Sequence, residues 1–170
     1  GKLTGIITIG DIANAYMDVY DNCILSTAKT SYKNILETLD AKMIVGSEDG
    51  FFESGEVVIA TANPDVLEDY IHPGDMVILG NRYETQLCAI EMGAACVVIS
   101  MGAKVSKTIQ HFAKEHNCIV INTPYDSFTV ARLINQSMSI GYFMKKEKLT
   151  TFRVTDKTED IRAIMKKKRY

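Results

Sequence analysis

Four short apolar runs, mostly of β-branched residues, recur roughly twenty residues apart in the middle of the chain, and they limit the possible fold more than any other feature. They lie in the segments "EVVIATANPD", "DMVILGNRYE", "ACVVISMGAK" and "CIVINTPYDS". A strand with one solvated face alternates apolar and polar residues, whereas these runs are continuously apolar. Strands buried on both faces are typical of a parallel sheet covered by helices. We therefore predict an α/β fold with a central, mostly parallel sheet and flanking helices.

The segments between the runs show the apolar spacing of amphipathic helices. Three of them carry an apolar stripe along one side: 83–92, 105–116 and 125–138. In the second, Ile109 and Ala113 share a face while Lys107 and Lys114 point away. The stretch "SYKNILETLDAKMIVG" supplies a further helix and strand ahead of the repeat. Residues from about 30 to 136 therefore form one compact α/β unit, with right-handed crossovers expected.

The two flanks of the chain differ from this core. Residues 1–8 read as a buried strand that runs directly into a helix. At the other end, "LTTFRVTDKTEDIRAIMKKKRY" predicts an extended piece followed by a helix with Ile161, Ile164 and Met165 on its inner face. Acidic residues begin that helix and basic residues end it, which suits the helix dipole. Neither flank can bury its apolar face alone, so we interpret each as half of a unit whose other half lies outside this sequence.

Charge and hydropathy exclude two classes of partner. The net charge of −2 argues against nucleic-acid binding, which needs a basic surplus, although Lys166–Arg169 form one local basic run. No apolar run approaches the roughly 18–20 residues that span a bilayer, and no signal-peptide pattern is present. We therefore expect a cytoplasmic protein that binds neither nucleic acid nor membrane.

The cysteines and histidines do not suggest a metal site. The four cysteines form no C-x-x-C pair, and Cys88, Cys96 and Cys118 lie in apolar contexts typical of buried free thiols. His111 and His116 are five residues apart, so a helix would not direct both at one ion. We expect no metal and no cofactor in this segment.

In a parallel sheet, ligands bind at the carboxyl ends of the strands. The predicted loops at that edge contain hydrogen-bonding and small residues and one cation: Thr61, Asn63, Gly80, Asn81, Arg82, Ser100, Gly102, Asn122 and Thr123. This set includes no paired carboxylates, no Cys/His couple and no Ser/His/Asp set. The same residues are common in turns and helix caps, so the sequence leaves open whether the loops bind a ligand or only shape the backbone.

The segment "GIITIGDI" places Thr8 just before a helix and Asp11 in its first turn. A carboxylate at that position can accept both hydroxyls of a ribose, and the Thr8 hydroxyl and the free N–H groups of the helix start can donate to phosphate. The same two residues also suit simple helix capping, in which the dipole favours Asp11. Locally, both interpretations stand.

The wider context adds a family resemblance. "GKLTGIITIGDIANAYMD" resembles the closing strand and helix of a CBS domain, the cystathionine-β-synthase module. That pattern, Gly–aliphatic–aliphatic–Thr–x–x–Asp, is matched by Gly5, Ile6, Ile7, Thr8 and Asp11. "LTTFRVTDKTEDIRAIMKKKRY" resembles the opening of a second CBS domain, with an extended piece, a polar turn and a helix.

The segment between these halves, from "IHPGDMVILGNRYE" to "YDSFTVARLI", resembles a DRTGG domain. The family's Asp-Arg stands here as Asn81-Arg82, and its Thr-Gly-Gly as Ser100-Met101-Gly102. The resemblance divides the chain into 1–22 (first CBS part), 23–147 (DRTGG-like domain) and 148–170 (second CBS part). This order is similar to the regulatory region of the CBS-containing family II inorganic pyrophosphatases.

The resemblance implies a regulatory function without catalysis. In that family, paired CBS domains bind adenine nucleotides: AMP and ADP inhibit, whereas ATP and diadenosine polyphosphates activate. The catalytic part uses Asp/His clusters, including an Asp-His-His motif, to hold manganese or magnesium, and this chain has no such motif. The implied protein is a homodimeric, manganese-dependent inorganic diphosphatase of which this chain is the nucleotide-sensing segment.

Carried over position by position, the resemblance assigns a nucleotide site. Thr8 and Asp11 match the phosphate and ribose contacts of the module. The adenine pocket would be lined by Ile6 and Ile7 of the first part and by Thr150, Thr151 and Phe152 of the second. Arg169, or the adjacent Lys168, would approach the phosphates, although a solvated helix end explains this basic run equally well.

Two other functions remain open at this stage. The DRTGG-like core could serve as a dimerisation or interaction module that binds no ligand. An independent acyl- or phosphoryl-transfer enzyme would have to use the Asn81-Arg82 and Ser100 loops, and it would need a nucleophile–base pair that the sequence does not offer.

Overall fold

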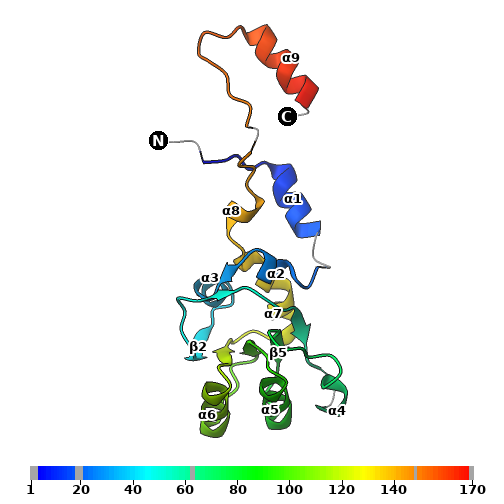
Figure 1. The fold of residues 1–170 in the computed structure, drawn as a ribbon, viewed down its shortest axis with the longest axis vertical. Helices are drawn as coiled ribbons and strands as arrows, with labels where there is room; N and C mark the ends of the chain where they lie inside the picture. The colour runs from blue at the N-terminus through cyan, green and yellow to red at the C-terminus, as the bar shows by residue number, and fades with distance from the viewer. Residues whose placement is uncertain (1–3, 18–20, 62–63, 148, 169–170) are drawn as a thin grey trace.

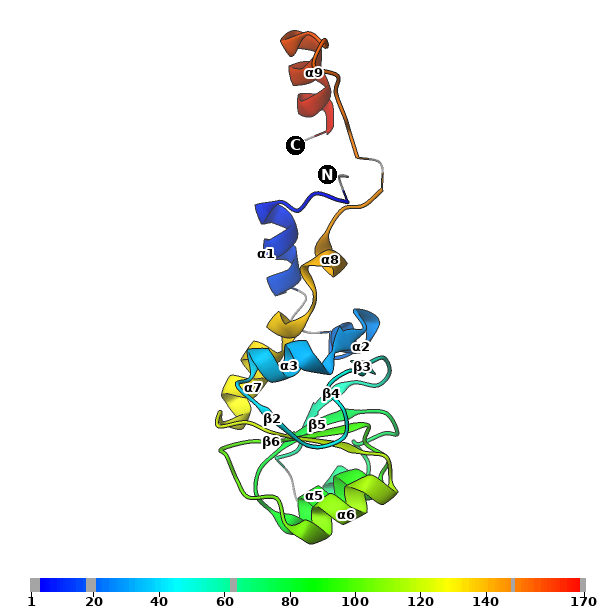
Figure 2. The ribbon, with the colours of Figure 1, turned by 90° about the vertical axis from the view of Figure 1, so that its left-hand side faces the viewer.

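The computed structural model describes residues 4–17, 21–61, 64–147 and 149–168. Figures 1 and 2 show an elongated molecule with an α/β core at one end and both flanks extending from the other. The elements in chain order are α1 (Ile9–Met17), α2 (Ile24–Thr27), β1 (Thr30–Ser31), α3 (Tyr32–Thr38), β2 (Lys42–Val45), β3 (Phe51–Phe52), β4 (Val57–Ile59), α4 (Pro64–Leu67), β5 (Met76–Leu79), α5 (Tyr83–Glu91), β6 (Cys96–Ile99), α6 (Lys107–Glu115), β7 (Ile119–Asn122), α7 (Ser127–Leu133), the 3₁₀ helix η1 (Ile134–Ser137), α8 (Ile140–Phe143) and α9 (Thr158–Lys168).

The main sheet has five strands in the order β2-β7-β6-β5-β4. Strands β4 to β7, which are the four repeated apolar runs, pair in parallel, whereas β2 joins the edge antiparallel to β7. Strands β5 and β6 are buried at every position, as their continuous apolar sequence requires. A short β1–β3 pair forms a second, antiparallel sheet. The predicted mostly parallel α/β fold is confirmed.

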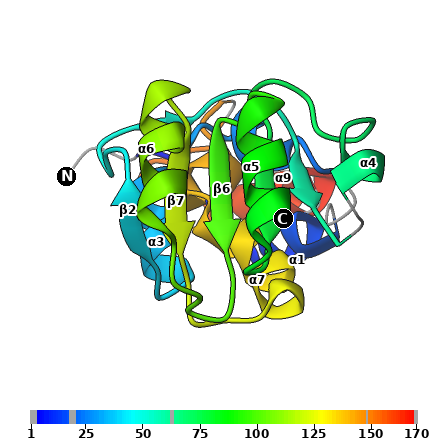
Figure 3. The same ribbon diagram turned by 90° about the horizontal axis from the view of Figure 1, so that it is seen from below.

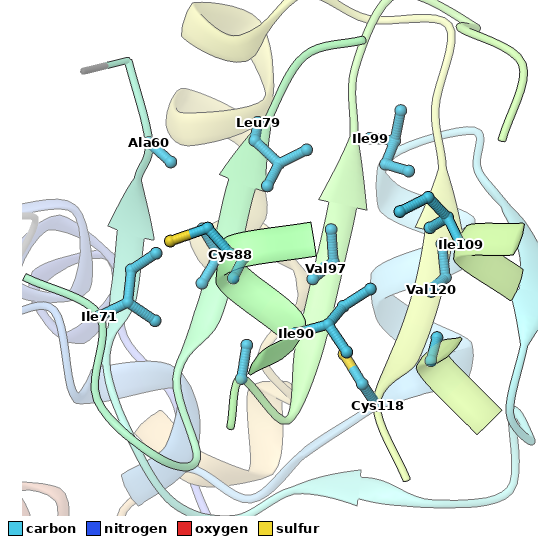
Figure 4. Close-up of a cluster of buried hydrophobic side chains, with 14 of the residues drawn as sticks. Ala60, Ile71, Leu79, Cys88, Ile90, Val97, Ile99, Ile109, Cys118 and Val120 are labelled. Atoms are coloured by element: carbon cyan, nitrogen blue, oxygen red, sulfur yellow. The ribbon is translucent and has the colours of Figure 1, made fainter. Parts of the chain in front are cut away.

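Two helical layers sandwich this sheet. Helices α4, α5 and α6 follow successive strands onto one face, while α3, α7 and η1 cover the other (Figures 2 and 3). Within β6, Val97 faces the first layer and Val98 the second, because successive side chains of a strand alternate. Figure 4 shows the first layer, where Ile90 and Ile109 pack onto the valines of the sheet. The core is therefore closed on both faces.

Two of the predicted core helices, α6 and α7, begin at side-chain caps. Ser106 accepts a hydrogen bond from the Ile109 N–H at the start of α6, and Asp126 accepts from Phe128 and Thr129 at the start of α7. The single helix predicted over 125–138 is instead α7 followed by η1, so its last turn is tightened to 3₁₀ geometry. No helix among the residues with a described placement is long and apolar enough to cross a membrane.

The N-terminal flank differs from its prediction. Residues 1–3 lie outside the described structure, and residues 4–8 form no buried strand: Ile6 makes one isolated antiparallel bridge with Lys145 and keeps 36% of its exposure. The physical reason is the lack of neighbouring strands, because a single bridge buries neither face of an extended segment. Helix α1 begins at Ile9, as predicted from Thr8 and Asp11.

The C-terminal flank is also open. Helix α9 has no buried residue; Ile164 and Met165 keep 39% and 42% of their exposure, so their predicted inward orientation is wrong for this structure. The helix still has the predicted charge order, with Glu159 and Asp160 in its first turn and lysines in its last. Its apolar side has no element packed against it within the described chain, which explains the exposure.

Candidate functional site

Thr8 and Asp11 form a reciprocal cap at the start of α1. The Asp11 N–H donates to Thr8 Oγ1 at 3.3 Å, and Asp11 Oδ2 accepts from the Thr8 N–H at 2.8 Å and from the Thr8 hydroxyl at 2.7 Å. This is the capping-box arrangement, in which residues N-cap and N3 satisfy each other's backbone N–H. In this structure the Thr8 proton is therefore directed at Asp11.

Lys145 completes this cluster from the other side of the core in the sequence, not in space. Its Nζ lies 3.0 Å from Asp11 Oδ1, and its backbone exchanges two hydrogen bonds with Ile6, at 3.0 and 2.9 Å. Lys145 follows α8, so the segments before α1 and after α8 lie side by side although about 140 residues separate them in the chain (Figure 2). Sequence reasoning missed Lys145, because nothing in the run "FMKKEK" indicates which lysine faces Asp11.

Gly5 permits the close approach of these two segments. A Cβ at Gly5 would collide with the Met144 side chain and would lie 2.9 Å from the Lys145 carbonyl oxygen. Only a residue without a side chain fits under Met144 here. The close packing of Met144 against Gly5 thus explains why a glycine stands at the first position of the CBS-like pattern in this structure.

The electrostatics of the cluster favour a charged carboxylate. Hydrogen bonds from the Thr8 hydroxyl, from Lys145 and from the Thr8 N–H lower the pKa of Asp11 from 3.8 to about 2, because each donates to the ionised form. The side chain keeps 12% of its exposure. Asp11 is therefore an anionic hydrogen-bond acceptor throughout the physiological pH range.

The remaining capacity of Asp11 can be counted. A carboxylate offers about four lone-pair positions. Thr8 uses two of them on Oδ2 and Lys145 uses one on Oδ1, which leaves room for one further donor. To accept both hydroxyls of a ribose, Asp11 has to give up one of these contacts, either with the Thr8 hydroxyl or with Lys145, and the freed donor would then be available to a phosphate group.

The second flank brings two of its predicted residues together. Lys168 Nζ donates to Thr150 Oγ1 at 2.8 Å, so the end of α9 folds back onto the extended piece before it. Thr151 is exposed and Phe152 half-buried. Arg169 lies outside the described residues. Between 149–168 and 4–17, as far as each is described, no hydrogen bond or ion pair forms, so no polar contact joins Thr150 and Thr151 to Ile6 and Ile7.

The polar residues at the carboxyl edge of the core sheet divide into two groups. Ser100, Asn122 and Thr123 hydrogen-bond to backbone carbonyls of Leu79, Ala103 and Leu39, which matches a purely structural role. Four of the others line a pocket of about 210 Å³ together with two helix residues that the sequence did not single out, Thr85 and Ser127. Gly102 does not line this pocket, and its N–H donates to the Thr123 carbonyl. The pocket is lined by Ala60, Thr61, Gly80, Asn81, Arg82, Thr85 and Ser127. Asn63 lies outside the described residues.

The thiols of the core are poor nucleophiles. Cys88, Cys96 and Cys118 are buried, as predicted. Burial raises the pKa of Cys118 to about 12 and also raises that of Cys96, because the thiolate loses its hydration. Across the described part of the chain, no three His, Cys, Asp or Glu side chains gather where they could hold a metal ion.

A five-stranded α/β core with both faces covered by helices defines the class of fold. Residues 34–137 match the DRTGG domain family, and the chain belongs to that family. The match spans the sheet from β2 to β7 and its covering helices, and ends at η1.

Particular relatives extend the likeness to the flanks. A cobalt-dependent inorganic pyrophosphatase of Clostridium perfringens is 38% identical over 168 residues, which are 99% of this chain and 31% of that protein. A probable manganese-dependent inorganic pyrophosphatase of Thermotoga maritima is 29% identical over 164 residues, which are 96% of this chain and 30% of that protein. The chain thus spans about a third of the length of these relatives.

A solved structure covers the same region. The CBS and DRTGG domains of the regulatory region of C. perfringens pyrophosphatase, complexed with the activator diadenosine tetraphosphate, superpose with a TM-score of 0.86 at 38% identity. The match covers 99% of this chain and 73% of the solved chain. The CBS–DRTGG resemblance inferred from the sequence is confirmed.

Proposed function

We propose that this chain is the adenine-nucleotide-sensing regulatory region of a family II inorganic pyrophosphatase, and that catalysis lies in a part of the protein outside this sequence. The observation that carries the proposal is the full-length likeness to a regulatory region that was solved with diadenosine tetraphosphate. The names of the relatives support manganese or cobalt as the metal of that catalytic part. AMP and ADP would inhibit, and ATP or diadenosine polyphosphates would activate.

In this proposal, residues 1–22 and 148–170 are parts of two CBS modules and 23–147 are the DRTGG domain. Each module part leaves apolar side chains uncovered, such as Ile9 at 86% and Met165 at 42% of full exposure. Completion of the modules and pairing with a second copy would bury these side chains, which supports a homodimer. The adenine would then lie against Ile6, Ile7, Thr150, Thr151 and Phe152.

Asp11 and Lys145 suggest how binding is transmitted. A ribose that takes both oxygens of Asp11 displaces Lys145, and Lys145 or Lys168 then faces the phosphates. Because Lys145 also pairs with Ile6 through its backbone, this exchange would move the connection between the CBS part and the DRTGG core. Nucleotides that differ in phosphate number would shift the population between two arrangements of the modules by different amounts.

The alternative function is an interaction module that dimerises without ligand. The exposed apolar side chains of the flanks support association with another surface. Both functions therefore include association between chains, and only the first includes nucleotide binding. Association that depends on protein concentration and ignores nucleotide would favour the alternative.

Calorimetric titration of AMP and of diadenosine tetraphosphate into the full-length protein tests the proposal. Thr8→Ala combined with Asp11→Ala should weaken binding at least about tenfold, since it removes a charged acceptor of the ribose. Asp126→Asn is a matched control, because Asp126 caps α7 with the same kind of network, to Phe128 and Thr129, in the core. Unchanged affinity in the double variant would reject this site, and no binding to the unaltered protein would reject the function.

A further inference from the structure

The pocket at the carboxyl ends of β4 and β5 lies in the core, apart from the flanks that carry the nucleotide site. Ala60 follows β4 and Gly80, Asn81 and Arg82 follow β5; Figure 4 shows Ala60 and Leu79 at this same edge of the sheet. Ser127 reaches the pocket from α7 on the opposite helical layer. A volume of about 210 Å³ is below the roughly 300–1,000 Å³ of pockets that hold drug-sized ligands, so it suits a small group.

An unpartnered donor distinguishes this pocket. Thr85 is 3% exposed, and its hydroxyl is buried without a hydrogen-bond partner among the described residues. A buried hydroxyl without a partner destabilises a protein, because folding removes its hydrogen bonds to water and no intramolecular hydrogen bond replaces them. Thr85 lines the pocket, and less than 1 Å² of its hydroxyl oxygen is accessible, so a ligand there supplies the missing partner when the side chain rotates toward it.

The rest of the lining is suited to an anion. Helix α5 begins at this pocket, and its N-cap residue Arg82 makes no side-chain cap, so the first N–H groups of the helix are free of intrahelical partners. The Arg82 side chain is exposed and forms no ion pair within the described structure. Glu84 and Asp126 are the neighbouring carboxylates in the sequence, and neither lines the pocket.

The loop itself is held firmly and leaves space for a ligand. Gln86, which is 3% exposed, donates to the Gly80 carbonyl at 3.0 Å and so fixes the turn that presents Arg82. A Cβ added at Gly80 would meet no heavy atom within 4 Å, so the backbone is approachable at that point. The turn is thus ordered before any ligand arrives.

The hydroxyls of Ser100 and Ser127 define which anion fits. Ser100 Oγ donates to the Leu79 carbonyl at 3.0 Å, and the two serine oxygens lie 3.1 Å apart. Because a carbonyl only accepts, Ser100 is the donor to Leu79. Either oxygen could donate in the contact between the two serines, and the arrangement that keeps both hydrogen bonds takes Ser127 as the donor. In that arrangement Ser127 offers only lone pairs to the pocket and pairs with a ligand that donates a proton. Hydrogen phosphate carries such a hydroxyl at neutral pH, and sulfate does not.

We propose that this pocket of the DRTGG core binds inorganic hydrogen phosphate. Its oxygens accept from Arg82, from the first N–H groups of α5 and from the Thr85 hydroxyl, while its own hydroxyl donates to Ser127. Two residues of the degenerate family signature, Asn81 and Arg82, line this site. This phosphate site is independent of the proposed nucleotide site, and it can be tested in the absence of any nucleotide.

Hydrogen–deuterium exchange of the full-length protein, read on peptides that cover 80–86, tests the proposal with potassium phosphate as the only ligand. Phosphate should slow exchange of these amides, and potassium sulfate at the same ionic strength should not. Arg82→Gln should raise the half-saturating phosphate concentration about 10- to 100-fold, since a charge-assisted hydrogen bond is lost. Arg132→Gln is the matched control, because Arg132 lies on α7 against Phe128 and does not line the pocket.

Thr85→Val separates a binding role from a structural one. If the hydroxyl serves the ligand, this variant loses phosphate protection and yet unfolds at an equal or higher temperature without phosphate, because an unsatisfied buried group is gone. A variant that unfolds at lower temperature but keeps full protection would overturn the proposal. The proposal would also be overturned if millimolar phosphate did not protect the 80–86 amides of the unaltered protein from exchange, or if sulfate protected them equally.

Discussion

The core and the flanks of this chain are built from similar parts and reach different degrees of closure. Both begin helices with a Thr/Asp hydrogen-bond network, at Thr8–Asp11 in α1 and at Asp126–Thr129 in α7. In the core, two helical layers bury the sheet on both faces. The N-terminal flank is joined to the segment after α8 by one backbone bridge and one ion pair, and α9 has no buried residue. A closed region buries its own apolar side chains, whereas an open region leaves apolar side chains that a ligand or a partner can cover.

A pair of matched truncations gives the largest test of this contrast. Ile90→Ala removes a fully buried side chain from between α5 and the sheet, and should destabilise the core by about 2–5 kcal/mol through lost burial and a cavity. Ile164→Ala makes the same kind of truncation on α9, where the side chain is 39% exposed, and should change stability by less than about 0.5 kcal/mol.

Hydrogen exchange of the β5 and β6 amides measures the first effect, because these strands open only when the core unfolds. The contrast would break down if Ile164→Ala accelerated exchange in the core strands as strongly as Ile90→Ala. Such a result would mean that α9 packs on another surface of the whole protein.

How far the sequence could predict this molecule follows the same division. The four parallel strands could be predicted because a continuously apolar run indicates a strand that is buried on both faces. Strand β6, for example, is buried at every position. The antiparallel direction of β2 could not, because β2 pairs with β7 across about 75 residues and no local signal sets that direction. Residues 1–8 were predicted as a buried strand because their apolarity was read without knowing which neighbours are present.

The candidate sites show the same limit. Thr8 and Asp11 could be found from their local spacing, since a cap depends on residues three apart. Lys145 and Thr85 could not: one reaches Asp11 from the other end of the chain, and the other is distinguished only by a hydrogen bond that it lacks. Neither a contact between distant segments nor a missing hydrogen-bond partner produces a local pattern in the sequence.

Two glycines five residues apart, Gly5 and Gly10, sharpen the comparison within the N-terminal flank. Gly5→Ala forces a Cβ into Met144 and the Lys145 carbonyl, and should cost about 1–3 kcal/mol at the Ile6–Lys145 bridge through overpacking. Gly10→Ala adds a Cβ whose nearest neighbour is Thr8 Oγ1 at 3.6 Å, an ordinary contact, and should stabilise α1 by about 0.5–1 kcal/mol. The amide exchange rates of Ile6 and Lys145 report both effects. Equal effects of the two substitutions would show that Met144 does not seat on Gly5 in solution.

The smallest expected effect concerns the charge of Asp11. Its pKa of about 2 lies below the ordinary 3.8, so the stabilisation that its hydrogen bonds supply is fully present above about pH 4 and is lost as the pH falls toward 2. Lys145→Met removes one donor and should move the titration midpoint upward, while the Thr8 bonds keep it below 3.8. The midpoint is measured from the NMR chemical shift of the Asp11 carboxyl carbon as the pH is lowered. If Lys145→Met leaves the titration midpoint of Asp11 unchanged, the ion pair is not held in solution, and the connection between α1 and the segment after α8 rests on the Ile6 bridge alone.

Addition of diadenosine tetraphosphate extends the measurement. If a ribose displaces Lys145, the titration midpoint of Asp11 in the bound protein should become insensitive to Lys145→Met, because residue 145 no longer touches Asp11 in either protein.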